Sequence, residues 1–504
     1  MVRRASLARS AGRVALDRAF ALHLRRGFGP RPIFSAGLEN RWEGKPAGGI
    51  GLRGGAGDGR TGGVKKALLA IAIQVAVSVA ILWGLDRHFG RDAPPSDESE
   101  FAVERPDVAP EDNAFTYFLQ ATNFLSYPED GKYILSYFAG DPARAQDIEQ
   151  LLEDHQECFS LIEEGTKRSI CLAPPLKGYE DIATCPQPWL KMGRLLGLRN
   201  RSAWLAGKYS KAVSHLQTTL RFGDLVQKDA ECLVVYLVGS AICSMAFEQA
   251  IDLAQDERVS DRDLKRLAGL LAGVGPFDRG LERAVRREYR FGASIIDDIR
   301  KHRENAGIFQ MEGADIGKRR IWLLVRSNYL FQPNRTKEHL AERIRSILRL
   351  VPKTYGDMGM ADVPWVRREM KALESNRIGW MIMNIAQLKV SPILEAKCKA
   401  EGGLAGARLV VACNRFEREF GRWPLKLQEL VPGYLAEVPR DPYDGNPFRY
   451  SAEKERVWAV GTNLTDEGGS MQIKGLNKGY IAGRDRPRTE DFVFELQDSP
   501  PAEQ

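Results

Sequence analysis

The chain has 504 residues, of which 43% are hydrophobic and 28% are charged, so it is long enough for two or three domains and apolar enough to bury a core. Its net charge of +7 is unevenly placed, because residues 1–66 hold 14 Lys and Arg against 4 Asp and Glu and the rest of the chain is close to −3. A nucleic-acid-binding protein carries its basic surface on the folded part. We therefore expect no nucleic-acid partner.

Residues 1–63 form an Arg- and Gly-rich leader that we expect to be disordered, since ten glycines within residues 44–63 cannot bury a core. Two explanations stay open. Eight arginines against one acid in residues 1–35 are typical of a mitochondrial presequence, which would direct the chain to the mitochondrial inner membrane. Alternatively the start is misassigned and translation begins at Val64, a normal bacterial membrane-insertion start and the explanation that we favour.

The next segment predicts a transmembrane helix over residues 64–86. Its central part, residues 67–85, reads ALLAIAIQVAVSVAILWGL and holds no charge. At about 1.5 Å per residue it is about 28 Å long, close to the thickness of a bilayer's hydrocarbon core. The segment lacks the polar stripe of a core helix and the cleavage site of a signal peptide. We therefore predict a retained single-pass anchor that binds the membrane through residues 67–85.

The charges that flank this segment predict its orientation. Lys65 and Lys66 precede it, whereas residues 86–112 contain nine acids and three arginines. Because the positive flank stays in the cytoplasm, we expect the C-terminal part to be extracytoplasmic and the protein to lie in a bacterial inner (cytoplasmic) membrane. The acidic, proline-containing residues 87–112 predict a stiff linker that holds the following domain away from the membrane.

Residues 113–375 have the hydrophobic periodicity of a helical domain. Asp141-Pro142 predicts a helix start, and the helix after it has one apolar face that includes His155, expected to be a core-edge histidine. Residues 203–223 look like a helical hairpin of tetratricopeptide type with a turn at Gly207-Lys208. No strict 34-residue period is present, so we predict an irregular helix-hairpin stack. The dense charges of residues 276–350 are typical of solvated helix faces.

The seven cysteines and six histidines show no metal-ligand spacing. Cys171 and Cys185 flank a proline-rich loop and are the best candidates for a disulfide, which an extracytoplasmic location permits. No nucleotide-binding, hydrolase or zinc-protease motif is present. We therefore expect no enzymatic activity and no cofactor, although a carboxylate pair assembled in space would leave no trace in the sequence.

Residues 376–496 have a different pattern, which predicts a small α+β module followed by a disordered tail at 497–504. A long helix over about 376–420 ends at Gly421 and Pro424. Strands follow in FRYS, RVWAVGTN and DFVFEL, separated by turns such as Asp444-Gly445. The predicted fold class is thus mainly α, with one transmembrane helix, the helix-hairpin stack and a C-terminal helix plus a short antiparallel sheet.

This module resembles the C-terminal part of the major pseudopilin of type II secretion systems over about 120 residues. The family has a helix that ends in a phrase like Y-x-x-x-x-G-R-Y-P. It continues with L-x-x-L-V-P-x-Y-L-x-x-V-P-x-D-P-x-x-x-P-x-x-Y and then with G-x-x-x-x-D-D-G. The residues that match these phrases are Phe416, Gly421, Arg422, Pro424, Leu427, Leu430, Pro432, Val438, Pro439, Asp441, Pro442, Pro447, Tyr450, Gly461, Asp466, Glu467 and Gly468. The whole chain is similar to large membrane proteins of planctomycete and verrucomicrobial bacteria, a resemblance that implies no activity.

The pseudopilin resemblance implies a calcium site, with Asp466, Glu467 and Asp491 as its ligands. Calcium prefers such oxygen ligands, although the loop here is longer and more basic than the family's. The resemblance does not extend to assembly, because Gly63-Val64 is followed by neither the Phe nor the Glu of a prepilin-peptidase signal.

Together these features predict a membrane-tethered scaffold of the bacterial envelope that contacts a protein partner and does not catalyse a reaction. A receptor that binds a peptide or ligand on the helical stack is the first alternative. An enzyme with a carboxylate site that has no sequence motif is the second.

Overall fold

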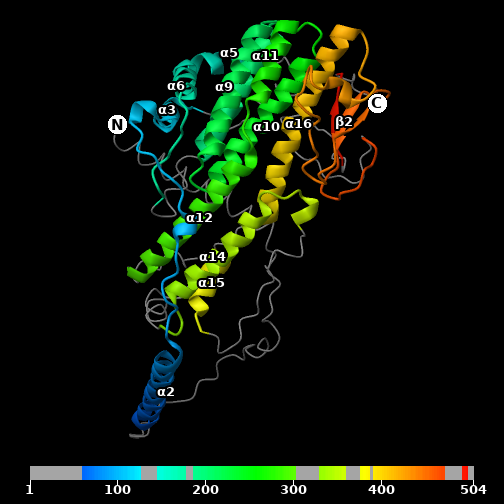
Figure 1. Cartoon of the computed structure of the whole chain (residues 1–504). Coiled ribbons are helices and arrows are strands. Elements are labelled where there is room, and N and C mark those ends of the chain that lie inside the picture. The colour runs from blue at the N-terminus through cyan, green and yellow to red at the C-terminus, as the bar shows by residue number, and fades with distance from the viewer. Residues whose placement is uncertain are drawn as a thin grey trace, which may run out of the picture. The chain divides into compact units, whose positions relative to one another are not determined.

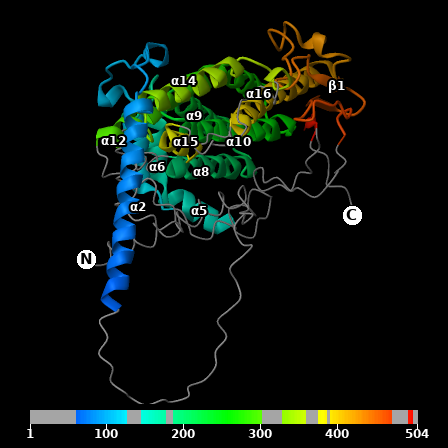
Figure 2. The ribbon, with the colours of Figure 1, turned by 90° about the horizontal axis from the view of Figure 1, so that it is seen from below.

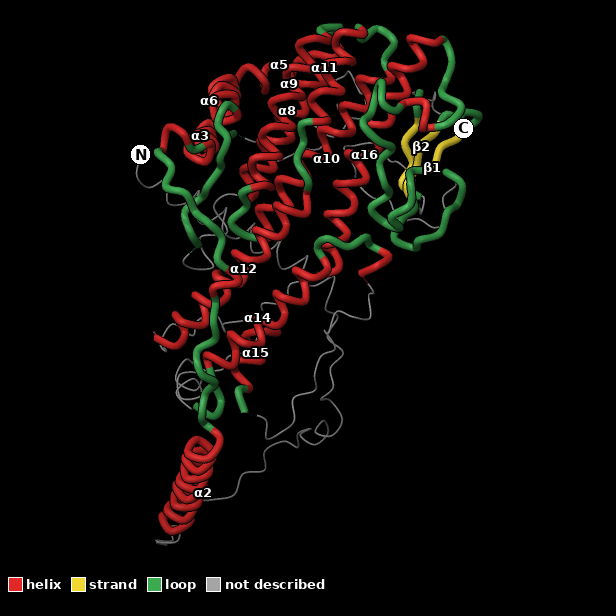
Figure 3. Tube along the Cα trace, in the orientation of Figure 1, coloured by secondary structure: helices red, strands yellow, loops and turns green. Residues whose placement is uncertain are grey.

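A computed structural model of the chain is mainly helical, with one small antiparallel sheet near the C-terminus (Figures 1 and 3). This agrees with the predicted fold class at that level. The structure describes residues 60–126, 145–176, 186–301, 328–358, 375–385, 390–470 and 491–497. The chain divides into two units, residues 1–74 and residues 75–504. The described part of the first unit is the beginning of helix α2 (Arg60–Phe89).

Two described helices are long and apolar enough to cross a membrane: residues 69–89 of α2, and α10 (Leu233–Gln255). They differ in burial. Val75, Val77 and Val79 of α2 are each more than half exposed, whereas most of α10 is buried among other helices. The length and composition of α10 are thus explained by its place in a core. Within the described part of the chain, the large apolar side chains from Leu69 to Ile81 of α2 are all more than half exposed.

The body of the second unit is a stack of helices around α10. Its other members are α3 (Ala114–Ala121), α5 (Ala145–Asp154), α6 (Gln156–Thr166), α8 (Pro186–Leu205), α9 (Tyr209–Lys228), α11 (Asp261–Ala272), α12 (Phe277–Lys301), α14 (Pro333–Leu350), α15 (Arg377–Ile385) and α16 (Val390–Phe420). Helices α8, α9 and α16 lie along α10, and α12 pairs with α14 (Figures 1 and 2). Short 3₁₀ turns at Ser99–Phe101, Pro110–Asp112, Thr122–Phe124, Gly356–Met358 and Leu427–Leu430 connect them.

The predicted helical hairpin is confirmed as α8 and α9. The turn between them contains Gly207, whose φ of 71° lies in the left-handed region that favours glycine. The next pair, α9 and α10, also packs closely. A Cβ at Gly239 of α10 would lie 2.4 Å from the Gln227 backbone nitrogen, and one at Gly223 of α9 would lie 2.7 Å from the Cys243 sulfur. Glycine at both positions permits this packing.

The apolar face predicted after residue 141 is present in α5 and α6, while Asp141-Pro142 itself lies outside the described residues. Ile148 and Phe159 are fully buried on that face. His155 lies between the two helices, where its Nδ1 is 2.7 Å from the Leu151 carbonyl and its Nε2 accepts a hydrogen bond from the Ser126 N–H. It is the satisfied core histidine that the pattern predicts.

Residues 87–112 pack against the helical body, which corrects the prediction of a stiff spacer. The ring of Phe101 is fully buried and stacks on Tyr289 of α12 with a centroid distance of 4.0 Å. Next to it, the Glu100 carboxylate accepts a hydrogen bond from Arg345 Nε of α14 at 2.9 Å. Glu100 and Phe101 of this segment therefore have partners on α14 and α12.

The charged helices α12 and α14 are not solvated on every face, which corrects a second prediction. Arg287 and Arg343 are 6% and 4% exposed. Burial raises the pKa of Glu288 and lowers the pKa of Arg343 to about 10. A helical period places every third or fourth residue on the same face, so a dense run of charges necessarily directs some of them inward.

The C-terminal module contains α16 and a sheet in the order β1 (Arg449–Ser451), β2 (Arg456–Ala459) and β3 (Phe492–Glu495), all antiparallel. The sheet lies against α16 (Figure 3), where a Cβ at Gly406 would come within 2.4 Å of the Phe494 ring. As predicted, α16 ends at Gly421, with φ at 66°. The helix predicted over 376–420 is described as two helices, α15 and α16, with residues 386–389 outside the described part.

The module shares its core with the helical body. Helix α16 packs along α10, and Gln255 Nε2 of α10 donates a hydrogen bond to the Glu495 carbonyl of β3 at 2.7 Å. Arg408 of α16 also donates to the Leu271 carbonyl at 2.9 Å. The predicted boundary at residue 376 therefore marks a change in sequence pattern and does not separate two independent cores.

Replacing Gly239 by Ala is expected to destabilise the protein by about 1–3 kcal/mol, because the new methyl group meets backbone atoms of α9 that cannot move independently. Thermal unfolding in detergent, followed by circular dichroism, measures the change. Gly269→Ala on α11 is the matched control, since no atom lies within 4 Å of its Cβ position. That variant is expected to be stabilised by about 0.5–1 kcal/mol. Equal effects of the two substitutions would contradict close α9–α10 packing.

Candidate functional site

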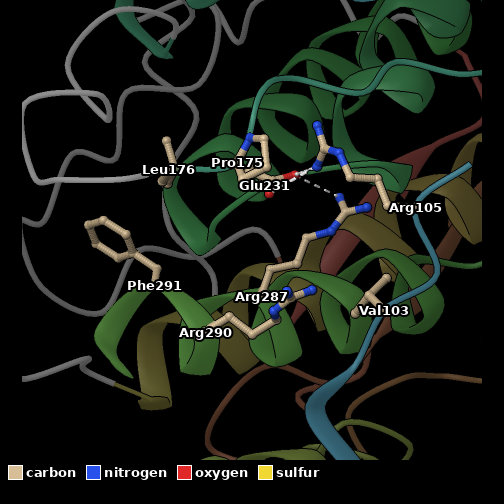
Figure 4. Close-up of a pocket in the computed structure, with 8 residues that line it drawn as sticks. All are labelled: Val103, Arg105, Pro175, Leu176, Glu231, Arg287, Arg290 and Phe291. Carbon is tan, nitrogen blue, oxygen red and sulfur yellow. Dashed lines mark hydrogen bonds and ion pairs between the residues drawn. The ribbon is translucent and has the colours of Figure 1, made fainter. Parts of the chain in front are cut away.

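The candidate site is a hollow of about 100 Å³ beside the turn that joins α9 to α10 (Figure 4). It is lined by Val103, Arg105, Pro175, Leu176, Glu231, Arg287, Arg290 and Phe291. These residues come from the packed segment after α2, from the start of the proline-rich loop, from the turn itself and from α12. The site thus collects four stretches of chain that are far apart in sequence.

Glu231 is the electrostatic centre of the hollow. Its carboxylate accepts from Arg105 at 3.1 Å and lies 3.4 Å from the Arg287 guanidinium, and the two arginines approach it from different sides (Figure 4). Glu231 and Arg287 are only 8% and 6% exposed. Burial also lowers the pKa of Arg287, whose charge Glu231 helps to retain.

The backbone of the turn is tied to the same side chains. Arg287 donates to the carbonyls of Asp229 at 2.6 Å and Ala230 at 3.0 Å. The Asp229 carboxylate accepts from Arg283 of α12 and from the Cys171 N–H, both at 3.1 Å. A buried turn must have its carbonyl and carboxylate groups hydrogen-bonded, and α12 supplies most of these donors. The cluster therefore fixes the end of α9, the start of α10 and the segment that carries Arg105.

The hollow is small, and its lining carries a net positive charge. Arg290 is exposed at its rim beside Phe291. Three guanidinium groups against one carboxylate, in about 100 Å³, fit a single carboxylate or phosphate group. No serine, cysteine, histidine or second carboxylate lines the hollow, so its described lining offers neither a nucleophile nor an acid–base pair.

The three predicted calcium ligands are only partly brought together. Asp466 accepts hydrogen bonds from Trp458 Nε1 at 2.9 Å and the Gly468 N–H at 2.8 Å, and it lies 3.5 Å from Arg449. Glu467 is a neighbour of Asp491 and contributes to the raised pKa of its carboxyl group. Within the described residues no group of three His, Cys, Asp or Glu side chains is placed to hold a metal ion. Most of the predicted loop, residues 471–490, lies outside that part, and calcium binding stays a prediction.

Asp491, which lies beside Glu467, has a carboxyl group with a raised pKa. Asp491 is 2% exposed and accepts from the Gly469 N–H at 3.0 Å. Burial, together with the hydrogen bond to Glu467, raises the pKa of Asp491 to about 6. A carboxyl group with such a pKa is typical of an acid–base catalyst, but it needs a substrate-sized space beside it. The described pocket that we identify lies elsewhere, at the α9–α10 turn.

A second charged cluster surrounds Arg449 in the module. Its guanidinium contacts the carboxylates of Asp441, Asp444 and Asp466. Asp441 also accepts from the Tyr443 N–H at 2.8 Å and the Val460 N–H at 2.7 Å. Burial raises the pKa of Asp441. Three carboxylates around one arginine connect the Asp441–Gly445 turn to β1 and β2, a structural role that the sequence pattern suggests for this turn.

The predicted disulfide cannot be assessed as a pair, because Cys185 lies outside the described residues. Cys171 is 4% exposed, beside the Asp229 carboxylate that accepts its N–H. Burial raises the pKa of Cys158, Cys232, Cys398 and Cys413 to about 12, and it raises that of Cys243 as well. These five thiols are buried and unreactive, as their apolar helical positions imply.

Comparison of the chain with protein-family models, with curated proteins and with solved structures finds no match. The functional argument therefore rests on the chain's own residues. Among these, sequence reasoning missed Arg105, Glu231 and Arg287. Nothing in their local pattern separates them from the surrounding surface charges. The one available signal is the position of Glu231 two residues before a long apolar helix, because a residue that enters a buried helix is itself often buried.

Glu231→Gln is expected to destabilise the protein by about 3 kcal/mol, because two arginines, one of them buried, lose their compensating charge. The midpoint of denaturant unfolding measures this. Glu282→Gln is the matched control, since Glu282 is 47% exposed and forms an i,i+4 pair with Arg286 on the same helix. Its loss is expected to cost less than about 0.5 kcal/mol. A similar loss of unfolding free energy in both variants would show that the ion pairs of Glu231 do not stabilise the fold.

Asp491→Asn is expected to change the pH dependence of stability. The native pKa of about 6 lies above the unfolded value near 3.9, so protonation favours the native state. This stabilisation is complete below about pH 4 and is lost as pH rises through about 6. The wild type should therefore lose on the order of 2 kcal/mol relative to the variant between pH 4 and pH 7.

The opposite slope is expected for a control variant, Asp466→Asn. Against the effect of burial, hydrogen bonds from Trp458 and the Gly468 N–H lower the pKa of Asp466. Its charged form therefore stabilises the native state at neutral pH, and that contribution is lost as pH falls through the native pKa. Unfolding free energies measured from about pH 2 to about pH 7 cover both transitions. They would contradict the assignment if both variants shifted the curve in the same direction.

Proposed function

We propose that this chain is a single-pass protein of a bacterial inner membrane whose helical body and C-terminal module lie outside the cytoplasm and act as a scaffold for contact with another envelope protein. The observation that carries the proposal is the contrast between the two described helices that are long and apolar enough to cross a membrane. Helix α10 is covered by α8, α9 and α16, whereas residues 75–81 of α2 keep more than half of each described apolar side chain exposed. A bilayer supplies the cover that such a helix needs.

The orientation follows from charge. Lys65 and Lys66 precede the span and the acid-rich residues 86–112 follow it, an arrangement that favours an extracytoplasmic C-terminus. Buried cysteines with raised pKa values are compatible with either redox compartment, so the flanking charges decide this part of the proposal.

A scaffold role is supported over the two alternatives by the candidate site. The hollow at the α9–α10 turn is large enough for one small anionic group, and Arg105, Glu231 and Arg287 use much of their hydrogen-bonding capacity to hold the turn. A peptide receptor would need a longer groove, and an enzyme would need reactive groups that line a cavity. The resemblance of the module to the pseudopilin, in which a long helix supports a short antiparallel sheet, makes a protein partner in the envelope the expected ligand.

Val77→Arg is expected to prevent stable membrane insertion, because a charged side chain at the middle of a single span costs about 3 kcal/mol. Alkaline carbonate extraction of membranes from a bacterial expression host measures the bound fraction, which should fall several-fold. Val234→Arg on the solvent-facing side of α10, where Val234 is 46% exposed, is the control and should remain in the membrane fraction. A wild-type chain that carbonate extracts, or a C-terminal alkaline phosphatase fusion that is inactive, would overturn the proposal.

A further inference from the structure

The C-terminal end of α2 is bonded to residues that follow it by more than 240 positions. The Asp86 carboxylate accepts a hydrogen bond from the Tyr329 N–H at 2.8 Å. One turn later the Phe89 carbonyl accepts from Gln332 Nε2 at 3.0 Å, and the Phe89 ring meets the Tyr329 ring edge-on at 6.4 Å. The last turn of α2 is therefore held by the chain just before α14.

Asp92 continues this connection by capping α14. Its two carboxylate oxygens accept from the N–H groups of Asn334 at 2.9 Å and Arg335 at 3.0 Å. These are free donors of the first turn of α14, which begins with Pro333. The Ala93 carbonyl accepts in addition from Asn334 Nδ2 at 2.8 Å. Because Asp92 caps α14 from a distant segment, the same hydrogen bonds fix the position of that segment and stabilise the start of the helix.

Helix α15 begins at the same place. The Asn376 N–H donates to the Tyr329 carbonyl at 2.7 Å, and the Ile378 N–H donates to the Leu330 carbonyl at 2.9 Å. The Asn376 side chain, fully buried, accepts from the Gln332 N–H at 2.8 Å. We call residues 86–93, 329–335 and 376–378 the joint, since they connect the end of α2 to the starts of α14 and α15.

The joint lies directly beyond the proposed span. Asp86 is the first residue after residues 67–85, and at about 1.5 Å per residue Phe89 is about 4.5 Å farther along the helix. The headgroup layer on each side of a hydrocarbon core is about 5–8 Å thick. Residues hydrogen-bonded to Asp86 and Phe89 therefore fall at the level of the headgroups whatever the tilt of α2.

The exposed side chains of the joint fit that environment. Arg87 and Arg91 are exposed, whereas the neighbouring acids Asp86 and Asp92 are half-buried and accept the backbone bonds described above. Phe89 is 61% exposed and Trp83 is 65% exposed, with the Arg87 guanidinium 5.4 Å from the Trp83 ring centroid. Arginines with exposed aromatic rings are suited to lipid phosphates and to the membrane interface.

We propose that the joint lies in the phospholipid headgroup layer and holds the starts of α14 and α15 against the bilayer surface. The proposal rests on the membrane span proposed above and goes beyond it. A tether alone would allow the helical body to move away from the membrane, whereas the joint fixes one end of that body at the surface. The partner of this surface is the headgroup layer of the membrane that α2 crosses.

The test places a fluorophore beside the joint. The full chain carrying Asn328→Cys, an exposed residue next to Tyr329, is labelled with an NBD maleimide and reconstituted into phosphatidylcholine and phosphatidylglycerol vesicles that contain a headgroup-nitroxide lipid. The matched control is Leu425→Cys in the C-terminal module, where Leu425 is 76% exposed. The wild-type chain, labelled in parallel, gives the background from native thiols. Quenching at position 328 is expected to exceed that at position 425 several-fold.

A double variant tests whether the joint causes this proximity. Asp86→Ala with Asp92→Ala removes the acceptors for three backbone N–H groups, and most of the excess quenching at position 328 should be lost. Asp97→Ala with Asp107→Ala, two exposed acids of the same segment, should retain it. A carbonate-resistant chain with equal quenching at both labels, or a joint variant that keeps the full excess, would overturn this inference. A chain that carbonate removes from the vesicles would instead overturn the proposed span.

Discussion

The fold of the body depends on the burial of α10, a long apolar helix most of whose residues are buried. An amphipathic helix needs one neighbour, whereas α10 has four, since α8, α9, α12 and α16 all contact it. Gly223 and Gly239 let α9 approach α10 closely, because a Cβ at either position would meet atoms of the other helix. The fourth neighbour, α16, comes from the C-terminal module, and this requirement explains why the module cannot be separated from the helices that precede it.

Surrounding α10 has an electrostatic consequence at its N-terminus. The turn that enters the helix is enclosed together with it, and Asp229 and Glu231 of that turn are buried with their charges. An enclosed carboxylate is stable only when it is paired and hydrogen-bonded. Arg283 and Arg287 of α12 and Arg105 of the packed segment satisfy this need. The candidate hollow is thus the space left where three chain segments converge on the entrance of one apolar helix.

The sequence predicts the local elements well and the long-range pairing poorly. Gly207 and Gly421 mark their turns because a positive φ is a local property, and the three strands follow from alternation and turn residues. The packing of residues 87–112 is different, since acids and prolines are equally typical of a free linker, and only the partners on α12 and α14 distinguish the two cases. The same holds for Arg287 and Arg105, which have the composition of surface charges and acquire their role from Glu231, far away in sequence.

The apolar surface of α2 must also be shielded from water, as that of α10 is. Both helices carry a large apolar surface that is unfavourable in water. The helical body covers most of this surface on α10, whereas the described part of the chain does not cover residues 75–81 of α2. The proposed bilayer would fill that need, and it would set a sharp boundary near Asp86, where the apolar run ends. Beyond that boundary the buried polar groups of the joint form hydrogen bonds within the chain, so none of them loses a hydrogen bond at the membrane surface. The arginines and aromatic rings are the groups left facing outward. A headgroup layer favours exposed arginines and aromatic rings together with satisfied backbone groups. The proposed span and the joint would therefore both follow from the boundary between the hydrocarbon core and the headgroups.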